Sequence, residues 1–248
     1  MLSLSKNDYG LNSNALKSIA AFTMLIDHIG VILFPHVTIL RIIGRISFPI
    51  YAFMIAEGCE HTKNKLKYFL LIFILGAGCQ TVLHIAKGPQ KLGVLISFSI
   101  SILTIYALQY MKSRVFSAET TIINKCFAVC VFLFALISVY FLNKHLRIDY
   151  GFWGCMTPLS ASLLKQPTFN KSTLLKKLDN KFLHLLLLSI CLVILGFRYR
   201  GTQMYALFSI IFLLFYSGKR GTLKMKYFFY IFYPVHLVIL EGISYLLP

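Results

Sequence analysis

Charged residues are scarce in this sequence. Asp, Glu, Lys and Arg together make up 13% of its 248 residues, whereas a soluble domain carries about 25%. Hydrophobic residues account for 58% of the chain. The shortage of charge excludes an ordinary soluble domain. It predicts an all-α, polytopic bundle of transmembrane helices, since helices satisfy their own backbone hydrogen bonds in lipid.

Cysteine patterns that bind metals are also missing. The six cysteines form no Cys-x-x-Cys pair and no Cys/His zinc spacing, so we predict neither a metal site nor a disulfide framework. They are Cys59, Cys79, Cys126, Cys130, Cys155 and Cys191. No nucleic-acid-binding motif accompanies the net charge of +17, so nucleic acid is not an expected partner.

A cleavable signal peptide, a soluble domain and internal repeats are not recognised in the sequence either. The first apolar segment is long, contains Asp27 and His28, and lacks a small-residue cleavage site. We therefore expect residues 1–248 to form a single integral membrane domain.

Apolar stretches with helical length divide the chain into about nine predicted helices. A helix rises about 1.5 Å per residue and must cross about 30 Å of hydrocarbon. The stretches are 15–34, 39–58, 68–86, 93–111, 122–142, 150–164, 182–197, 203–217 and 227–247. The sixth and eighth are short, so for these two both a thin crossing and a re-entrant segment remain open.

Basic residues alternate between the loops. The loops after the second, fourth, sixth and eighth stretches hold fifteen Lys and Arg residues, counting Lys125 at the start of the fifth stretch, and the loops after the third, fifth and seventh hold six. The positive-inside rule therefore places the richer loops and the N-terminus in the cytoplasm and the C-terminus outside. Topology thus explains the high net charge.

Two adjacent ionisable residues, Asp27 and His28, lie inside the first stretch. A bilayer core disfavours such groups by a few kcal/mol each, so they are expected to face other helices or a cavity. An imidazole in that position is a candidate for proton transfer at neutral pH.

The second stretch carries two arginines, Arg41 and Arg45, one helical turn apart. His28 and Arg45 are each about eight positions from the turn between the stretches, so both are expected at a similar depth. An Asp27–Arg45 ion pair is one prediction. Because adjacent helical residues point about 100° apart, Asp27 is expected to set the local field rather than hold the imidazole. Pro49 frees the carbonyl of Arg45 and predicts a kink or local opening.

Further ionisable residues occur in two other places. Glu57 and His61 are spaced i, i+4, which is typical of an interfacial pair. His236 follows Pro234 near the middle of the last stretch, at a depth comparable to that of His28. A lone membrane histidine often makes only a helix–helix hydrogen bond. Two at one depth, each beside a Gly or Pro, favour a shared polar cavity.

Ordered motifs carry a resemblance to a known family. The first stretch contains Leu16-Lys17-x-Ile19-Ala20 and Met24-x-Ile26-Asp27-His28-Ile29-Gly30. The second contains Arg41-x-x-Gly44-Arg45-x-x-Phe48-Pro49-Ile50-Tyr51-Ala52-Phe53, continuing into Ala56-Glu57-Gly58-x-x-His61-Thr62-x-Asn64. Later motifs are Asp149-Tyr150-Gly151, Tyr216-x-Gly218-Lys219-Arg220-Gly221 and Phe228-Phe229-Tyr230-x-Phe232-Tyr233-Pro234-x-His236-Leu237. Together these motifs resemble the TraX family, whereas residues 69–145 match only in hydropathy.

The resemblance implies an activity. TraX proteins are integral membrane acetyltransferases named for N-terminal acetylation of conjugative pilin, and they are similar to membrane acyltransferases that use a transmembrane histidine and cytosolic acetyl-CoA. The resemblance therefore implies an acyltransferase-like domain in the bacterial cytoplasmic membrane, with acetyl-CoA as co-substrate and a peptide or envelope acceptor. It implies that His28 is catalytic, as a general base or a transient acetyl carrier. The other implied site residues are Asp27, Arg45, Arg41, Glu57, His61 and His236.

Two other classes of function remain open. Ionisable residues within the membrane also line the paths of transporters and channels, although we find no inverted repeat of broken helices. A non-enzymatic assembly factor that contacts pilin or other membrane peptides is the third class. No residues are assigned to the CoA phosphates, because topology already explains the basic loops.

Overall fold

We analysed a computed structural model, which describes residues 10–88, 90–165, 178–223 and 225–246. These residues form helices and two isolated bridges, Leu11–Tyr216 and Leu92–Ile148. The helices are α1 (Ser13–Ile32), α2 (Thr38–Gly44), α3 (Ser47–His61), α4 (Lys65–Lys87), α5 (Val94–Val115), α6 (Ile122–His145), α7 (Gly151–Ser162), α9 (Lys181–Tyr199), the 3₁₀ helix η1 (Gly201–Phe208), α10 (Ser209–Leu214) and α11 (Lys226–Leu246). The predicted all-α class is confirmed.

Among the described residues, seven helices are long and apolar enough to cross a membrane, so the chain is a multi-pass membrane protein. They are Ser13–Ile32, Thr38–His61, Lys65–Ile85, Val94–Val115, Ile122–His145, Lys181–Tyr199 and Tyr227–Leu246. These seven correspond to seven of the nine predicted stretches; the sixth and eighth, for which crossing was left open, form shorter helices. The sixth forms only the 12 residues of α7, and the eighth forms η1 and α10.

The short helix α7 nevertheless runs beside α5 over most of its length. Near the start of α5, Ser97 Oγ donates to the carbonyl of Asp149, at 3.0 Å. Near its end, Lys112 Nζ donates to the carbonyl of Ser162, also at 3.0 Å. Ser97 and Lys112 are about 22 Å apart along the axis of α5. The segment containing α7 thus covers that depth in parallel with α5.

The segment formed by η1 and α10 also reaches further than its length in residues suggests. A 3₁₀ helix rises about 2.0 Å per residue, so eight residues of η1 and six of α10 extend about 25 Å. Its first part is hydrogen-bonded to Arg45 through Gln203. After its end, the carbonyl of Phe215 accepts from the backbone N–H of Leu11, at 2.8 Å.

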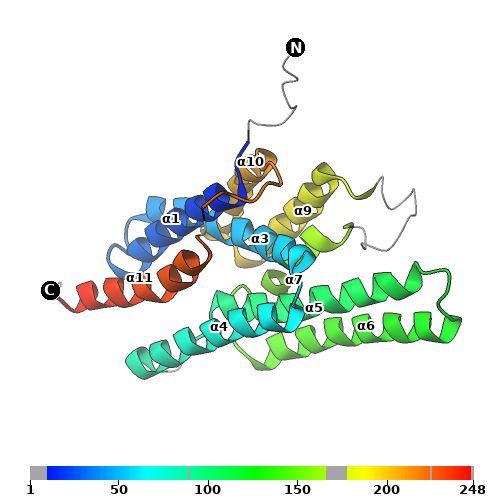
Figure 1. Ribbon diagram of the computed structural model, residues 1–248. Coiled ribbons are helices and arrows are strands. Elements are labelled where there is room, and N and C mark those ends of the chain that lie inside the picture. Colours follow the sequence, from blue (N-terminus) through cyan, green and yellow to red (C-terminus); the bar gives the residue numbers. More distant parts are fainter. Residues whose placement is uncertain (1–9, 89, 166–177, 224, 247–248) are drawn as a thin grey trace, which may run out of the picture. The chain divides into compact units, whose positions relative to one another are not determined.

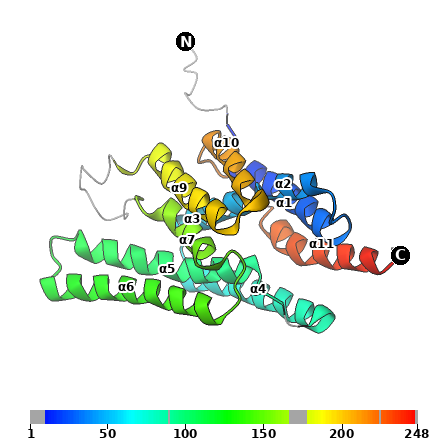
Figure 2. The same ribbon diagram turned by 180° about the vertical axis from the view of Figure 1, so that it is seen from behind.

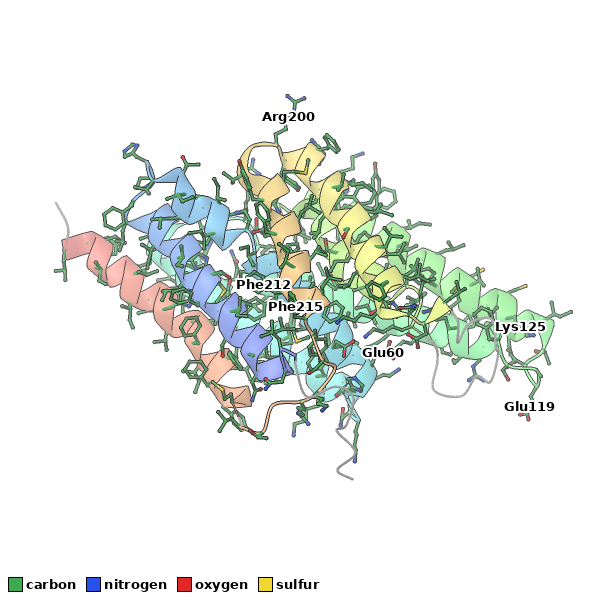
Figure 3. The ribbon with its side chains drawn as sticks, turned by 90° about the horizontal axis from the view of Figure 1, so that it is seen from above. Glu60, Glu119, Lys125, Arg200, Phe212 and Phe215 are labelled. Atoms are coloured by element: carbon green, nitrogen blue, oxygen red, sulfur yellow. The ribbon has the colours of Figure 1, made fainter. Side chains whose placement is uncertain are left out.

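The described chain divides into two compact units, residues 1–54 with 196–248 and residues 55–195. In the first unit, α1 packs against both α2 and α11 (Figure 1). In the second, α4 and α6 lie on either side of α5, and α7 also contacts α5 (Figures 1 and 2). Glu119 lies in the turn that joins α5 to α6, and Lys125 lies in the first turn of α6 (Figure 3). The single-domain organisation stays a prediction.

The first unit begins with a tight helical hairpin. The side chain of Asn12 caps α1 by accepting from the backbone N–H of Ala15, at 2.9 Å. Gly30 lets α2 approach closely, since a Cβ there would lie 2.8 Å from that of Leu40. The second predicted span breaks at residues 45 and 46, between α2 and α3. Pro49 cannot donate to the carbonyl of Arg45, so the predicted opening is confirmed.

Candidate active site

The carboxylate of Asp27 binds both arginines of the second predicted stretch, Arg41 and Arg45. Arg45 Nη2 donates to Asp27 Oδ1 at 2.7 Å and to Oδ2 at 2.9 Å, and Arg41 Nη1 donates to Oδ2 at 2.9 Å. The Arg45 side chain is 8% exposed and that of Asp27 is 14% exposed. The predicted Asp27–Arg45 ion pair is therefore present. It has one positive charge in excess, because two guanidinium groups share one carboxylate.

Gly44 makes room for this ion pair. A Cβ added to Gly44 would overlap the carboxylate of Asp27, whose side chain passes directly over the α2 backbone. Any larger residue at position 44 must therefore displace Asp27 from Arg45. This close approach explains why a residue that weakens helices stands at the end of α2.

We expect Gly44→Ala to destabilise the protein by about 3–5 kcal/mol, because moving Asp27 breaks its hydrogen bonds with the buried guanidinium of Arg45. Thermal unfolding in detergent measures this loss. Gly78→Ala is the matched control, since a Cβ at Gly78 meets nothing within 4 Å and alanine favours a helix interior. Equal melting temperatures for the two variants would contradict the packing described here.

The two histidines of the first and last helices are in direct contact. His28 Nδ1 and His236 Nε2 lie 2.7 Å apart. The ring centroids are 4.9 Å apart and the ring planes differ by 22°, so the rings meet through their edges. His236 is buried, with 5% exposed, and His28 is half-buried. The two residues that share a predicted depth are therefore brought together.

The partners of His236 determine which nitrogens carry protons. His236 Nδ1 lies 2.7 Å from the carbonyl oxygen of Phe232. A carbonyl only accepts, so Nδ1 of His236 is the donor; when His236 is neutral, its Nε2 then accepts from His28 Nδ1–H. The Nε2 of neutral His28 then carries a lone pair. It has no hydrogen-bond partner among the residues that the structure describes.

Aromatic rings hold His236 in this orientation. The Phe232 ring stacks on it with centroids 4.9 Å apart, and the Tyr233 ring meets it edge-on at 5.8 Å. Asp27 contacts the arginines and not His28, as predicted from the 100° offset. Asp27 and His28 are nevertheless adjacent residues of α1. The ion pair and the histidine pair therefore form one candidate site.

Glu57 and His61 belong to the second unit. His61 Nε2 lies 3.5 Å from Glu57 Oε2, which confirms the predicted i, i+4 pair. His61 is 76% exposed and Glu57 is 17% exposed. Lys165 Nζ also donates to Glu57 Oε1, a partner that the sequence did not indicate. Their predicted membership of the site stays a prediction.

Gln203 is the residue of the first unit that the sequence analysis missed. It is 5% exposed, and its Oε1 accepts from Arg45 Nη1 at 3.2 Å. A polar amide within the short eighth stretch was the available signal. Hydropathy alone does not single it out, because one glutamine changes the average of a stretch very little.

The family model described as TraX protein matches residues 12–244, nearly the whole chain. The chain belongs to the TraX family. The resemblance seen in the sequence motifs is thereby confirmed, and the matched range of this TraX family member includes every predicted site residue from Asp27 to His236.

A curated relative of this TraX family member matches over a shorter range. The chain is 43% identical over 53 residues to the uncharacterized protein RP591 of Rickettsia prowazekii (strain Madrid E). This match covers 21% of the chain and 20% of the Rickettsia protein, so it spans about a fifth of either one. No solved structure matches the chain.

Proposed function

We propose that this TraX family member is an acetyltransferase embedded in the bacterial cytoplasmic membrane. It moves an acetyl group from acetyl-CoA to an amine or hydroxyl acceptor, by family the N-terminus of a pilin or of another membrane peptide. The observation that carries the proposal is the lone pair on His28 Nε2, backed by His236 and the Phe232 carbonyl. Family membership supports the link to pilin and conjugation.

In the proposed reaction, His28 is the general base. The neutral acceptor nitrogen attacks the thioester carbonyl carbon and loses a proton to His28 Nε2. The C–S bond then breaks, and the CoA sulfur leaves and takes that proton. Such proton transfer contributes roughly 10²–10⁴ in rate. The bond from His28 Nδ1–H to His236 Nε2 stabilises the imidazolium that forms between the two steps.

The ion pair supplies the electrostatic part of the mechanism. Two arginines share the carboxylate of Asp27, so positive charge is left to stabilise the oxygen that becomes negative during transfer. Because the same lone pair of His28 is nucleophilic, a route through acetyl-histidine is the alternative. Trapping labelled acetyl on denatured protein distinguishes this route from direct transfer.

We also propose that the N-terminus and the α5–α6 turn at Glu119 face the cytoplasm. The fifteen basic residues of the even-numbered loops support this orientation. The lengths of the α7 segment and of η1 with α10 also support it. Both segments are then able to cross the membrane although they contain few residues. Acetyl-CoA would be consumed from the side of that turn.

Acetyl transfer in proteoliposomes tests the proposal. Labelled acetyl-CoA and a pilin-derived peptide are supplied on the side that exposes a Glu119→Cys reporter to an impermeant maleimide. We expect label on the peptide N-terminus and a melting temperature raised by acetyl-CoA. Substrate flux without CoA would instead indicate a transporter. If acetyl-CoA neither donates its acetyl group nor raises the melting temperature, the proposal is contradicted. The non-enzymatic assembly factor is then the remaining class of function.

A further inference from the structure

Gln203 presents a buried hydrogen-bond donor with a fixed direction. Its Oε1 accepts from Arg45 Nη1 at 3.2 Å. A guanidinium only donates, so this bond settles which end of the amide is oxygen. The other end, Nε2, is buried and has no hydrogen-bond partner among the described residues. Because an unpaired buried donor is destabilising, an acceptor oxygen from outside the protein is the natural partner.

The neighbours of Gln203 make this donor stronger. Arg45 is itself held by two hydrogen bonds to Asp27, so the chain of bonds runs from Asp27 through Arg45 to Gln203. A hydrogen bond from a cation to Oε1 polarises the amide, which strengthens donation from Nε2. Such a donor suits an oxygen that gains negative charge during a reaction.

The backbone that delivers Gln203 is strained. Arg200 and Gly201 have φ of 51° and 58°, and a non-glycine residue in this left-handed region is uncommon. The side chain of Arg200 points away from the helices (Figure 3). The strained turn therefore serves the path of the backbone into η1, and strain of this kind accumulates at functional sites.

We infer that Gln203 Nε2 binds the carbonyl oxygen of the acyl donor, the thioester oxygen of acetyl-CoA. The inference rests on the acetyltransferase function proposed above and assigns it a specificity-determining residue. Free CoA has the same nucleotide and thiol but lacks this oxygen. Gln203 is therefore the residue that lets the protein distinguish the loaded donor from the spent one.

The test is the ratio of dissociation constants for free CoA and acetyl-CoA, measured by titration calorimetry on the full chain in detergent. We expect wild type to prefer acetyl-CoA by about threefold to tenfold, the worth of one hydrogen bond. Gln203→Glu keeps the oxygen that accepts from Arg45 but removes the N–H donor. It should bring the ratio close to one and leave the affinity for free CoA within about twofold.

A second variant and a matched control complete the design. Gln203→Met removes the donor without adding charge and should lose the preference in the same way. Gln80→Glu changes a glutamine whose two ends are both paired, with Lys91 and Gly93, and should keep the wild-type ratio. Retention of the preference by both Gln203 variants, or a wild type that binds both compounds equally, overturns the inference alone. A wild type that binds neither compound overturns the proposed function as well.

Discussion

His28→Ala lowers the rate of acetyl transfer by roughly 10²–10⁴-fold, the contribution of a positioned general base. The lone pair on Nε2 of His28 is then gone, and so is the bond by which His236 supports the imidazolium. The rate is measured with labelled acetyl-CoA in proteoliposomes under single-turnover conditions.

His36→Ala is the matched control for this loss. His36 lies in the turn between α1 and α2 and is exposed, so its removal should leave the rate unchanged. Thermal unfolding of both variants separates catalysis from folding. A His28→Ala variant that melts near wild type and transfers acetyl at the wild-type rate would rule out the base.

Asp27→Ala should destabilise the protein by about 3–5 kcal/mol. Arg45 is 8% exposed, and without Asp27 its buried guanidinium loses two hydrogen bonds to a carboxylate. Arg41 is 31% exposed and so adds less, because water screens it. Equilibrium unfolding in detergent measures the loss, and acetyl transfer should fall with it because the arginines are no longer held in place.

A double-mutant cycle shows whether this loss arises from the pair. Asp27→Ala with Arg45→Leu should cost less than the sum of the single changes, by roughly 1–3 kcal/mol. Glu119→Ala, on the exposed α5–α6 turn, is the control and should leave stability unchanged. Additive effects at positions 27 and 45 would show that the two side chains are not coupled.

The course of the helices was largely predictable because it depends on local properties. Long apolar runs gave seven helices of sufficient length, and the break at residues 45 and 46 followed from the missing N–H of Pro49. The sixth and eighth stretches, for which crossing was left open, were harder to predict. Their reach depends on the 3₁₀ geometry of η1 and on the hydrogen bonds that align α7 with α5, and hydropathy contains neither.

The centre of the candidate site was predictable for a different reason. Counting residues from a shared turn gave His28 and Arg45 a similar depth, and the position of His236 near the middle of the last stretch gave it a comparable depth. The direction in which each side chain points within the bundle could not be obtained by counting residues. The tautomer of His28 depends on the Phe232 carbonyl through His236, which is a tertiary arrangement.

The contacts that the sequence analysis missed join residues far apart in the chain. Gln203 meets Arg45 across 158 positions, and Lys165 meets Glu57 across 108. Hydrophobic periodicity relates residues within one helix and says nothing about such pairs. The requirement for glycine at position 44 could not be predicted either, because it arises from the Asp27 side chain that passes over the α2 backbone.

Nitrogen-15 NMR of histidine-labelled protein in lipid bilayers tests the protonation of His28 most directly. We predict a protonated Nδ1 and an unprotonated Nε2 on His28 at neutral pH, with a scalar coupling across the 2.7 Å contact to Nε2 of His236. A proton on Nε2 of His28, or no coupling between the two rings, would contradict the account.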